Sequence, residues 1–186
     1  MSMEFGKYVS CDIEKCTGCK ACEVACFAEH NKDNKVVKTV GTVEVPVNPG
    51  LFVTHLSPTV CAPVQCKHCE DAPCLNVCSK SAIKRIDGQV IIDEDKCIGC
   101  KDCMLACPFG AITLQKMYKN AEAVKQTNGE ETRLSAHKCD LCVNNPEGPA
   151  CVRVCPNKAL GVVDPMETKE EKNKRALESM YASRTV

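Results

Sequence analysis

One twelve-residue stretch, at positions 97–108, constrains this chain more than any other. It places cysteines at positions 97, 100, 103 and 107 and a proline at 108, which is the pattern C-x2-C-x2-C-x3-C-P. The two-residue gaps let a tight loop present three sulfurs to three corners of a cube. The segment that follows is expected to be helical, so Cys107 lies one turn beyond Cys103 and faces another site. Such a run binds [4Fe–4S] clusters, with three thiolates on one cluster and the fourth on a second.

The same unit occurs four times along the chain. Each copy opens with C-x2-C and closes with C-x3-C, and the middle gap is two, four, two and eight residues in chain order. The sequence therefore predicts four [4Fe–4S] clusters with sixteen cysteines as iron ligands. These are Cys16, Cys19, Cys22 and Cys26; Cys66, Cys69, Cys74 and Cys78; Cys97, Cys100, Cys103 and Cys107; and Cys139, Cys142, Cys151 and Cys155.

Eighteen cysteines in 186 residues indicate disulfides, zinc or iron–sulfur chemistry. Disulfides do not account for repeated C-x2-C runs, whose spacing is not set by loop closure. Zinc is the stronger rival because C-x2-C pairs suit tetrahedral sites, yet zinc ribbons use separated pairs. Cys11 and Cys61 are left over, each five residues before the first cysteine of a motif. We interpret both as small buried thiols, with a redox or alternate-ligand role as the alternative.

The four motifs are expected to exchange ligands in pairs. In a two-cluster fold, the last cysteine of each motif binds the cluster of the other motif. Motifs two and three are neighbours and should exchange their last cysteines, which leaves motifs one and four to pair. The predicted ligand sets are Cys66, Cys69, Cys74 and Cys107; Cys97, Cys100, Cys103 and Cys78; Cys16, Cys19, Cys22 and Cys155; and Cys139, Cys142, Cys151 and Cys26.

This pairing predicts an α+β fold of two ferredoxin-like two-cluster modules, the second inserted into the first. A β-hairpin insertion and a C-terminal helix complete the chain. The first module is predicted to comprise residues 1–60 and 135–164, and the insertion occupies residues 27–60 within it. The second module is predicted at residues 61–115. A loop is expected at 116–134 and the C-terminal helix at 165–186.

Local patterns predict where strands and turns lie. A short strand is expected at Tyr8-Val9-Ser10, before the first motif. Within the insertion, residues 36–45 alternate in the manner of a strand. Asp87-Gly88 stands between two apolar runs and predicts a tight hairpin over residues 83–93. Residues 115–137 are polar and charged, so we expect a loop or a short exposed helix there.

The C-terminal segment predicts a helix that is weakly attached to the body. Asp164 can cap it and Pro165 suits its first position. The first half of the segment is almost entirely charged, and apolar residues gather only near its end. A solvated tail and a helix for partner docking or self-assembly are equally compatible with this pattern.

The histidines and the lysines beside the motifs are less informative. His68 is expected to be a hydrogen-bond donor or a neighbour of a cluster rather than a ligand, and His137 could tune a cluster. His30 and His55 are interpreted as surface residues. A lysine stands directly before the first cysteine of motifs one, three and four, at positions 15, 96 and 138. These lysines are expected to be solvated, and any that lay close to a cluster would favour its reduced form.

Composition excludes several other function classes. The formal net charge is zero, so there is no nucleic-acid footprint. No phosphate-binding loop, dinucleotide fingerprint or Ser–His–Asp arrangement occurs, so we expect no catalytic site. Sixteen thiolates and about +2 from each of four oxidised cluster cores would bring the loaded protein to about −8.

Neither a signal peptide nor an apolar run long enough to span a bilayer occurs in this sequence. We therefore expect a cytoplasmic protein in a reducing compartment, unless a partner carries an export signal.

The order of the four motifs resembles that of four-cluster iron–sulfur subunits in molybdenum and tungsten enzyme complexes and hydrogenases. Those include the electron-transfer subunits of dimethyl sulfoxide reductase, formate dehydrogenase and formate hydrogenlyase. The resemblance covers residues 7 to about 163 and is carried most strongly by residues 65–74 (QCKHCEDAPC) and 138–142 (KCDLC). The chain departs from the pattern in lacking a proline after Cys26 and after Cys78, which leaves the exit geometry of those motifs open.

The resemblance implies a non-catalytic electron-transfer subunit that connects the catalytic subunits of an anaerobic oxidoreductase complex. The small size looks most like the formate hydrogenlyase and hydrogen-dependent carbon dioxide reductase type, which implies a formate dehydrogenase or an iron-only hydrogenase as partner. Copies of the chain itself, or a paralogous ferredoxin-like subunit, could bind through the C-terminal helix. Two alternatives remain, a free polyferredoxin carrier and a filament-forming scaffold that also conducts electrons.

Overall fold

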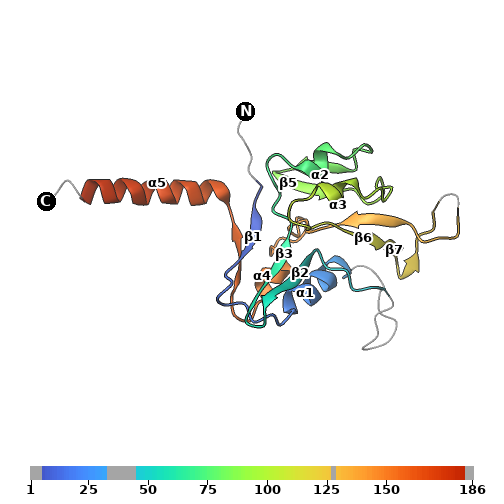
Figure 1. The fold of residues 1–186 in the computed structure, drawn as a ribbon, viewed down its shortest axis with the longest axis horizontal. Helices are drawn as coiled ribbons and strands as arrows, with labels where there is room; N and C mark the ends of the chain where they lie inside the picture. The colour runs from blue at the N-terminus through green and yellow to red at the C-terminus, as the bar shows by residue number, and fades with distance from the viewer. Residues whose placement is uncertain (1–5, 33–44, 127–128, 183–186) are drawn as a thin grey trace.

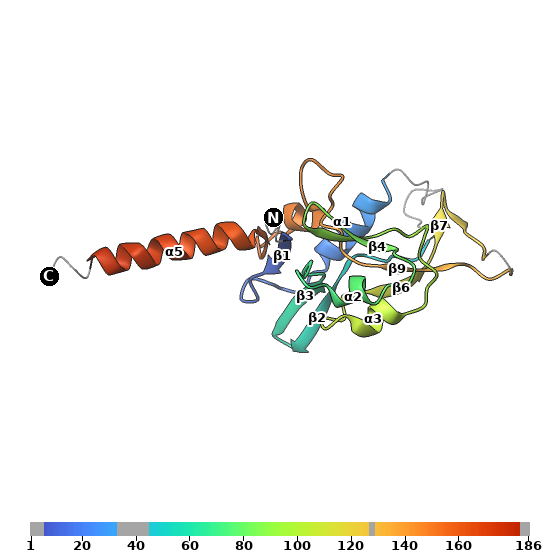
Figure 2. The same cartoon turned by 90° about the horizontal axis from the view of Figure 1, so that it is seen from above.

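The computed structural model describes residues 6–32, 45–126 and 129–182. Within these ranges, short strands pair into two-stranded antiparallel sheets that alternate with helices. One small body holds every described element except α5 (Pro165–Ala182), which extends away from it as a single rod (Figures 1 and 2). This mixture of short helices and strands agrees with the expected α+β class.

Each cysteine motif leads into a helix that carries its third cysteine. The four helices are α1 (Ala21–His30), α2 (Pro73–Asn76), α3 (Asp102–Ala106) and α4 (Ala150–Val154). A strand follows each of the last three: β4 (Ile83–Ile86), β6 (Thr113–Lys116) and β10 (Leu160–Val163). The first motif differs, because α1 is longer and continues past Cys26 to His30.

The two ends of the body lie side by side. Strand β1 (Tyr8–Cys11) pairs antiparallel with β10, so that Tyr8 lies opposite Val163 and Cys11 opposite Leu160. The strand expected near the N-terminus is confirmed. Its pairing brings the start of the first motif next to the end of the fourth.

The hairpin expected around Asp87-Gly88 is confirmed. Strand β4 pairs with β5 (Gln89–Ile92) in register, with Ile86 opposite Gln89. Both turn residues have positive φ, 47° at Asp87 and 79° at Gly88, as a two-residue hairpin turn of type I′ requires.

Two apolar clusters form the centre of the body, and buried cysteines belong to both. One gathers cysteines of motifs two and three around Ala82, Val90 and Ile112. The other gathers cysteines of motifs one and four around Val9, Leu51 and Leu160. Since large apolar side chains are few, the cysteine sulfurs themselves occupy much of the interior.

The β-hairpin of the insertion lies later in the chain than expected. It consists of β2 (Leu51–Ser57) and β3 (Val60–Gln65), with Leu51 opposite Gln65. Its second strand therefore runs through residues 61–65, up to the second motif. The strand predicted at residues 36–45 falls almost wholly outside the described residues.

The expectation of a loop or helix over residues 115–137 is wrong. Strand β6 pairs with β9 (Leu134–His137), and β7 (Tyr118–Lys119) pairs with β8 (Glu122–Ala123) beyond it. The Met117 N–H donates to the Arg133 carbonyl at 2.9 Å and continues the ladder between the two pairs. The strands lack the alternation of apolar and polar residues that would have predicted them, and backbone hydrogen bonds between the two sides of the hairpin hold them together.

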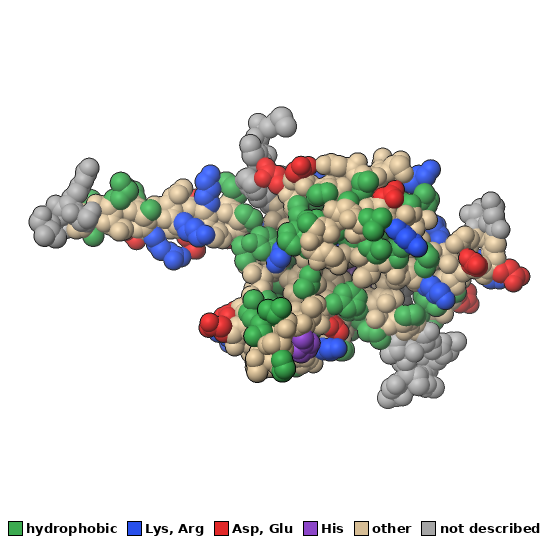
Figure 3. Space-filling view, viewed as in Figure 1, with side chains coloured by type: hydrophobic (Ala, Val, Ile, Leu, Met, Phe, Trp, Pro, Cys, Tyr) green, Lys and Arg blue, Asp and Glu red, His purple; other side chains and the backbone are tan. Residues whose placement is uncertain are grey.

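The C-terminal helix is confirmed, together with its cap. The Asp164 carboxylate accepts from the backbone N–H of Met166 at 2.9 Å and of Glu167 at 3.4 Å. None of the residues of α5 is buried. In the space-filling view, charged side chains line the rod where it leaves the body (Figure 3).

Candidate metal centres

The predicted ligand sets come together in space. Three of them line three separate pockets, and each pocket takes three cysteines from one motif and the last cysteine of another. Quartet A is Cys78, Cys97, Cys100 and Cys103; quartet B is Cys66, Cys69, Cys74 and Cys107; and quartet D is Cys16, Cys19, Cys22 and Cys155.

The fourth set, quartet C, consists of Cys26, Cys139, Cys142 and Cys151, and all four side chains are buried. Burial is the main cause that raises the pKa of the Cys139 and Cys142 thiols, and the charge of Cys26 on α1 adds to it in both. Burial likewise raises the pKa of Cys151 to about 12, with Cys26 as the next cause. Cys26 therefore lies within electrostatic range of all three motif-four cysteines.

Backbone N–H groups point at cysteine sulfurs in every quartet. Such donors favour thiolate over thiol and tune the potential of a bound iron–sulfur cluster. This donor set therefore fits [4Fe–4S] clusters. The contacts are Ala136 N–H to Cys97 Sγ (3.3 Å), His68 N–H to Cys66 Sγ (3.4 Å), Leu141 N–H to Cys139 Sγ (3.4 Å), Gly50 N–H to Cys26 Sγ (3.2 Å) and Ala159 N–H to Cys155 Sγ (3.2 Å).

The loop between the first two cysteines turns in the same way in all four motifs. The residue two positions after the first cysteine always has positive φ: 69° at Gly18, 47° at His68, 70° at Gly99 and 63° at Leu141. Glycine adopts this conformation without strain, whereas His68 and Leu141 need support from their surroundings. At Gly99 a Cβ atom would also lie 2.9 Å from the Leu134 carbonyl oxygen, so strand β9 leaves no room for a side chain.

The quartets follow one another in the order A, B, C, D. The pKa of Cys103 in quartet A is raised to about 11 by burial first, and Cys74 of quartet B is among the neighbouring charges that add to it. Cys66 of quartet B and Cys139 of quartet C belong to one buried cluster. Cys22 of quartet D is among the charges that act on Cys151 of quartet C.

The two ends of this order reach the surface. Of the sixteen cysteines, Cys19 in quartet D and Cys100 in quartet A are exposed, and the others are buried or half-buried. Quartet C is buried throughout, and quartet B is buried or half-buried. The geometry is that of a line of four sites with an accessible terminus at each end.

The 4Fe-4S dicluster domain family matches residues 58–165 of the chain, which include motifs two, three and four. Three relatives from Escherichia coli match most of it. Electron transport protein HydN is 36% identical over 85% of this chain and 88% of its own. Hydrogenase-4 component A is 38% identical over 90% of this chain and 88% of its own length. Formate hydrogenlyase subunit 2 is 36% identical over 92% of this chain and 89% of its own length.

The chain belongs to the family of ferredoxin-type [4Fe–4S] electron-transfer subunits. No helix in the described parts of this ferredoxin-type chain combines the length and apolar character that crossing a membrane requires.

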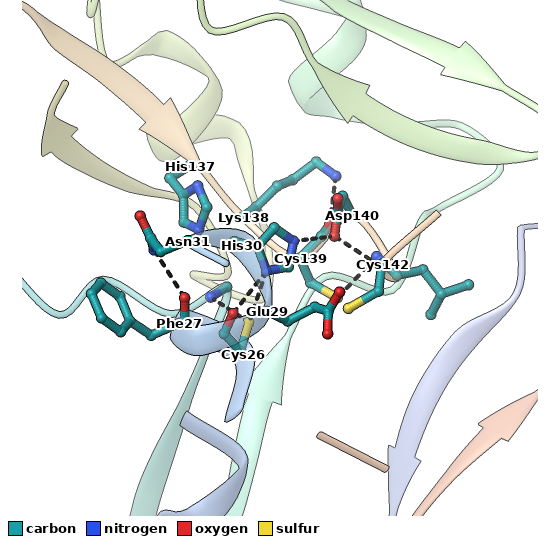
Figure 4. A network of polar contacts seen from close by, with 12 residues as sticks. Cys26, Phe27, Glu29, His30, Asn31, His137, Lys138, Cys139, Asp140 and Cys142 are labelled. Carbon is teal, nitrogen blue, oxygen red and sulfur yellow. Dashed lines mark hydrogen bonds and ion pairs between the residues drawn. The ribbon is translucent and has the colours of Figure 1, made fainter. Parts of the chain in front are cut away.

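His30 is not the surface residue that the sequence suggested. It ends α1, and its Nε2–H donates to Asp140 Oδ1 at 2.8 Å while its Nδ1–H donates to the Cys26 carbonyl at 2.8 Å (Figure 4). Because both partners only accept, the ring is an imidazolium, and the Asp140 hydrogen bond is the main cause that raises the pKa of His30. Asp140 also accepts from the Cys142 N–H at 2.9 Å. His30 thus ties α1 to motif four around quartet C.

His68, expected to be either a hydrogen-bond donor or a neighbour of a cluster, is buried beside Cys66, and its ring accepts a hydrogen bond. Its Nδ1 accepts from the Val90 N–H at 3.0 Å, and it is 1% exposed. Burial first, and the charge of Lys138 second, lower the pKa of His68 to about 3, so the ring is neutral. His137 contacts Glu94 at 3.2 Å, and its ring stands edge-on to that of His30.

The lysines before the motifs do not share one environment. Lys15 and Lys96 are exposed and pair with Asp12 and Asp93, each three residues earlier in the chain. The expectation of solvation is wrong for Lys138, which is 5% exposed. The sequence did contain a signal, because the residue three positions before this lysine is a serine, which cannot form an ion pair.

The two leftover cysteines both lie beside quartet D. Cys61 is buried, its S–H donates to the Cys16 carbonyl at 3.8 Å, and burial raises its pKa. Cys11 is half-buried, and burial first, then Cys16, raise its pKa to about 12. Cys61 is therefore the small buried thiol that was expected, whereas Cys11 is only half-buried. The sequence did not indicate that both would lie next to Cys16.

Proposed function

We propose that this chain is a non-catalytic electron-transfer subunit that holds four [4Fe–4S] clusters, one in each quartet. The observation that carries the proposal is the line of four quartets with an exposed cysteine at each end. A bound [4Fe–4S] cluster supplies a one-electron couple. The sixteen cysteines of quartets A to D would be its iron ligands, and Cys11 and Cys61 would not.

The protein's own part is to bind, space and insulate the clusters. Backbone N–H groups stabilise the thiolates, and the apolar side chains around quartets B and C exclude water. Since B and C are shielded, electrons would enter and leave beside Cys19 and Cys100. The same pairing of motifs supports two nested modules, residues 1–60 with 135–164 and residues 61–115 between them.

The partners would be catalytic subunits of an oxidoreductase complex, such as a formate dehydrogenase or a hydrogenase. Support comes from the relatives that are named as components of hydrogenase-4 and of formate hydrogenlyase. The α5 helix supports a docked role over free diffusion, because it buries no residue of its own and leaves Leu177 68% and Tyr181 72% exposed. A filament-forming role of α5 would add to this function and not replace it.

The test is anaerobic purification of the native assembly, followed by mass, subunit composition, and iron and sulfide content. We expect roughly sixteen iron atoms per chain, together with at least one large catalytic subunit. A chain that ran alone with all four clusters would overturn the docked role and leave a free carrier. Half the expected iron would overturn the assignment of four clusters.

The role of α5 has its own test. Deletion of residues 165–186 is expected to leave iron content unchanged and to lower the mass of the assembly. An unchanged mass would contradict a docking or assembly role for the helix.

A further inference from the structure

Lys138 occupies an unusual place for a lysine. It directly follows β9, is 5% exposed, and lies beside the quartet C network (Figure 4). Its Nζ donates to two backbone carbonyls, that of Val90 on β5 and that of Cys139 at 3.0 Å. One of these belongs to the hairpin between motifs two and three, and the other to motif four. The ammonium group therefore joins two parts of the body.

Neither acceptor carries a formal charge that would balance the ammonium. Across residues 6–32, 45–126 and 129–182, no carboxylate forms an ion pair with Lys138. The carboxylate of Asp140, two residues further along the chain, pairs with His30 instead. A buried, unpaired ammonium is strongly unfavourable, because carbonyl dipoles replace only part of its lost hydration. Its burial calls for a source of negative charge nearby.

Quartets B and C both lie close to this lysine. Val90, whose carbonyl accepts from the Lys138 ammonium, lines the pocket of quartet B together with Cys66, Cys69, Cys74 and Cys107. Cys139 of quartet C is its neighbour in the chain, and Cys139 and Cys66 share one buried cluster. Four thiolates around an oxidised core of about +2 carry about −2. Lys138 would therefore lie close to two anionic groups.

The matching lysines of the other motifs show that this burial is particular to motif four. Lys96 stands before Cys97 just as Lys138 stands before Cys139, yet it is exposed and its Nζ lies 3.5 Å from an Asp93 carboxylate oxygen. In motif four Ser135 takes the place of that aspartate and is fully buried. Motif four thus lacks the aspartate that pairs with the lysine of motifs one and three, and its lysine is the one that lies close to two quartets.

We propose that Lys138 supplies a positive charge that partly balances the negative charge of the clusters in quartets B and C and raises their reduction potentials. The inference rests on the proposed function, because it needs clusters in those quartets. Reduction adds one electron to a cluster and takes its charge from about −2 to about −3. A fixed cation in a poorly solvated site stabilises the reduced form more than the oxidised form. Lys138 acts by placing a positive charge near the clusters and does not bind iron.

The test compares Lys138→Met with Lys96→Met in the full-length, cluster-loaded chain. Iron and sulfide are counted first, and each variant is then titrated with dithionite while the reduced clusters are followed by electron paramagnetic resonance. We expect Lys138→Met to lower the reduced-to-oxidised ratio of two clusters at least tenfold at a given potential, about 59 mV for a one-electron couple. Lys96→Met should shift no cluster by even half as much, because solvent screens its charge.

Equal shifts in the two variants, with four clusters bound in both, would overturn the inference and leave the proposed function intact. A wild-type chain with fewer than four clusters would instead count against the proposed function.

Lys138→Arg and Lys138→Gln provide the test if the Lys138→Met variant does not bind four clusters. If the arginine variant holds four clusters and both neutral variants lose two, a positive charge is required there, as proposed. If the arginine variant also fails to hold them, the lysine serves packing, and the inference is wrong.

Discussion

The cysteine-rich body and the α5 helix are stabilised by different forces. The body buries its cysteines together with small and medium apolar side chains, and its strands are only two to seven residues long. Helix α5 buries nothing and is stabilised by the Asp164 cap and by charged pairs along its own surface, such as Arg175 with Glu171. The body should therefore depend on metal for its fold, while α5 should not respond to metal.

Iron removal should have the largest effect and should separate the two regions. Chelation under anaerobic conditions is expected to abolish the cooperative thermal transition of the body, because metal–thiolate bonds substitute for a large apolar core. Circular dichroism and hydrogen exchange would follow the loss. Native-like protection of strands β1 and β10 in the iron-free chain would show that apolar packing alone holds the body.

Loss of a single ligand should remove one cluster of the four. Cys139→Ser is expected to lower iron content by about a quarter, since quartet C loses a buried sulfur while the other quartets keep theirs. Cys61→Ser is the matched control, because Cys61 is equally buried but lies outside the quartets. A loss of iron in the control would instead favour Cys61 as a ligand.

The next-largest effect should come from the His30 hydrogen bonds that connect α1 to motif four. His30→Ala removes two hydrogen bonds and leaves Asp140 without its cation, so we expect a loss of about 2 kcal/mol in the free energy of unfolding. Denaturant titration of the holoprotein measures it. The exposed His55 is the control, and His55→Ala should change the stability by less than about 0.5 kcal/mol. Equal effects would refute the structural role of His30.

The smallest effect should be confined to α5. Asp164→Ala removes the carboxylate that caps the helix and is expected to cost about 1 kcal/mol of local helix stability. Faster amide exchange in residues 166–170 would report it, while the melting temperature of the body stays nearly constant. Asp164→Asn keeps a capping oxygen and should restore protection. A drop in the body's melting temperature in both variants would point instead to the ion pair of Asp164 with Lys7.

The differences between sequence and structure have a common cause. The strands of the long hairpin after β6 went unrecognised because their residues are polar, and the contacts that hold them are backbone hydrogen bonds to residues about twenty positions away. His30 gave no local signal either, because its partner Asp140 lies 110 residues away. The charged residues before each motif could be recognised in the sequence. The absence of an acid three residues before Lys138 became significant only when the structure showed that this lysine is buried.

The sequence by itself determined the repeated motif, the family and the capped C-terminal helix, and it predicted the pairing of the cysteines into four sets. These follow from local spacing, since a tight loop and a helical turn fix where neighbouring sulfurs can point. Only the tertiary structure decided which cysteines reach solvent, which quartets touch, and which of three equivalent lysines is buried. Those properties depend on how distant segments cover one another, because solvent access and electrostatics arise between elements rather than within them.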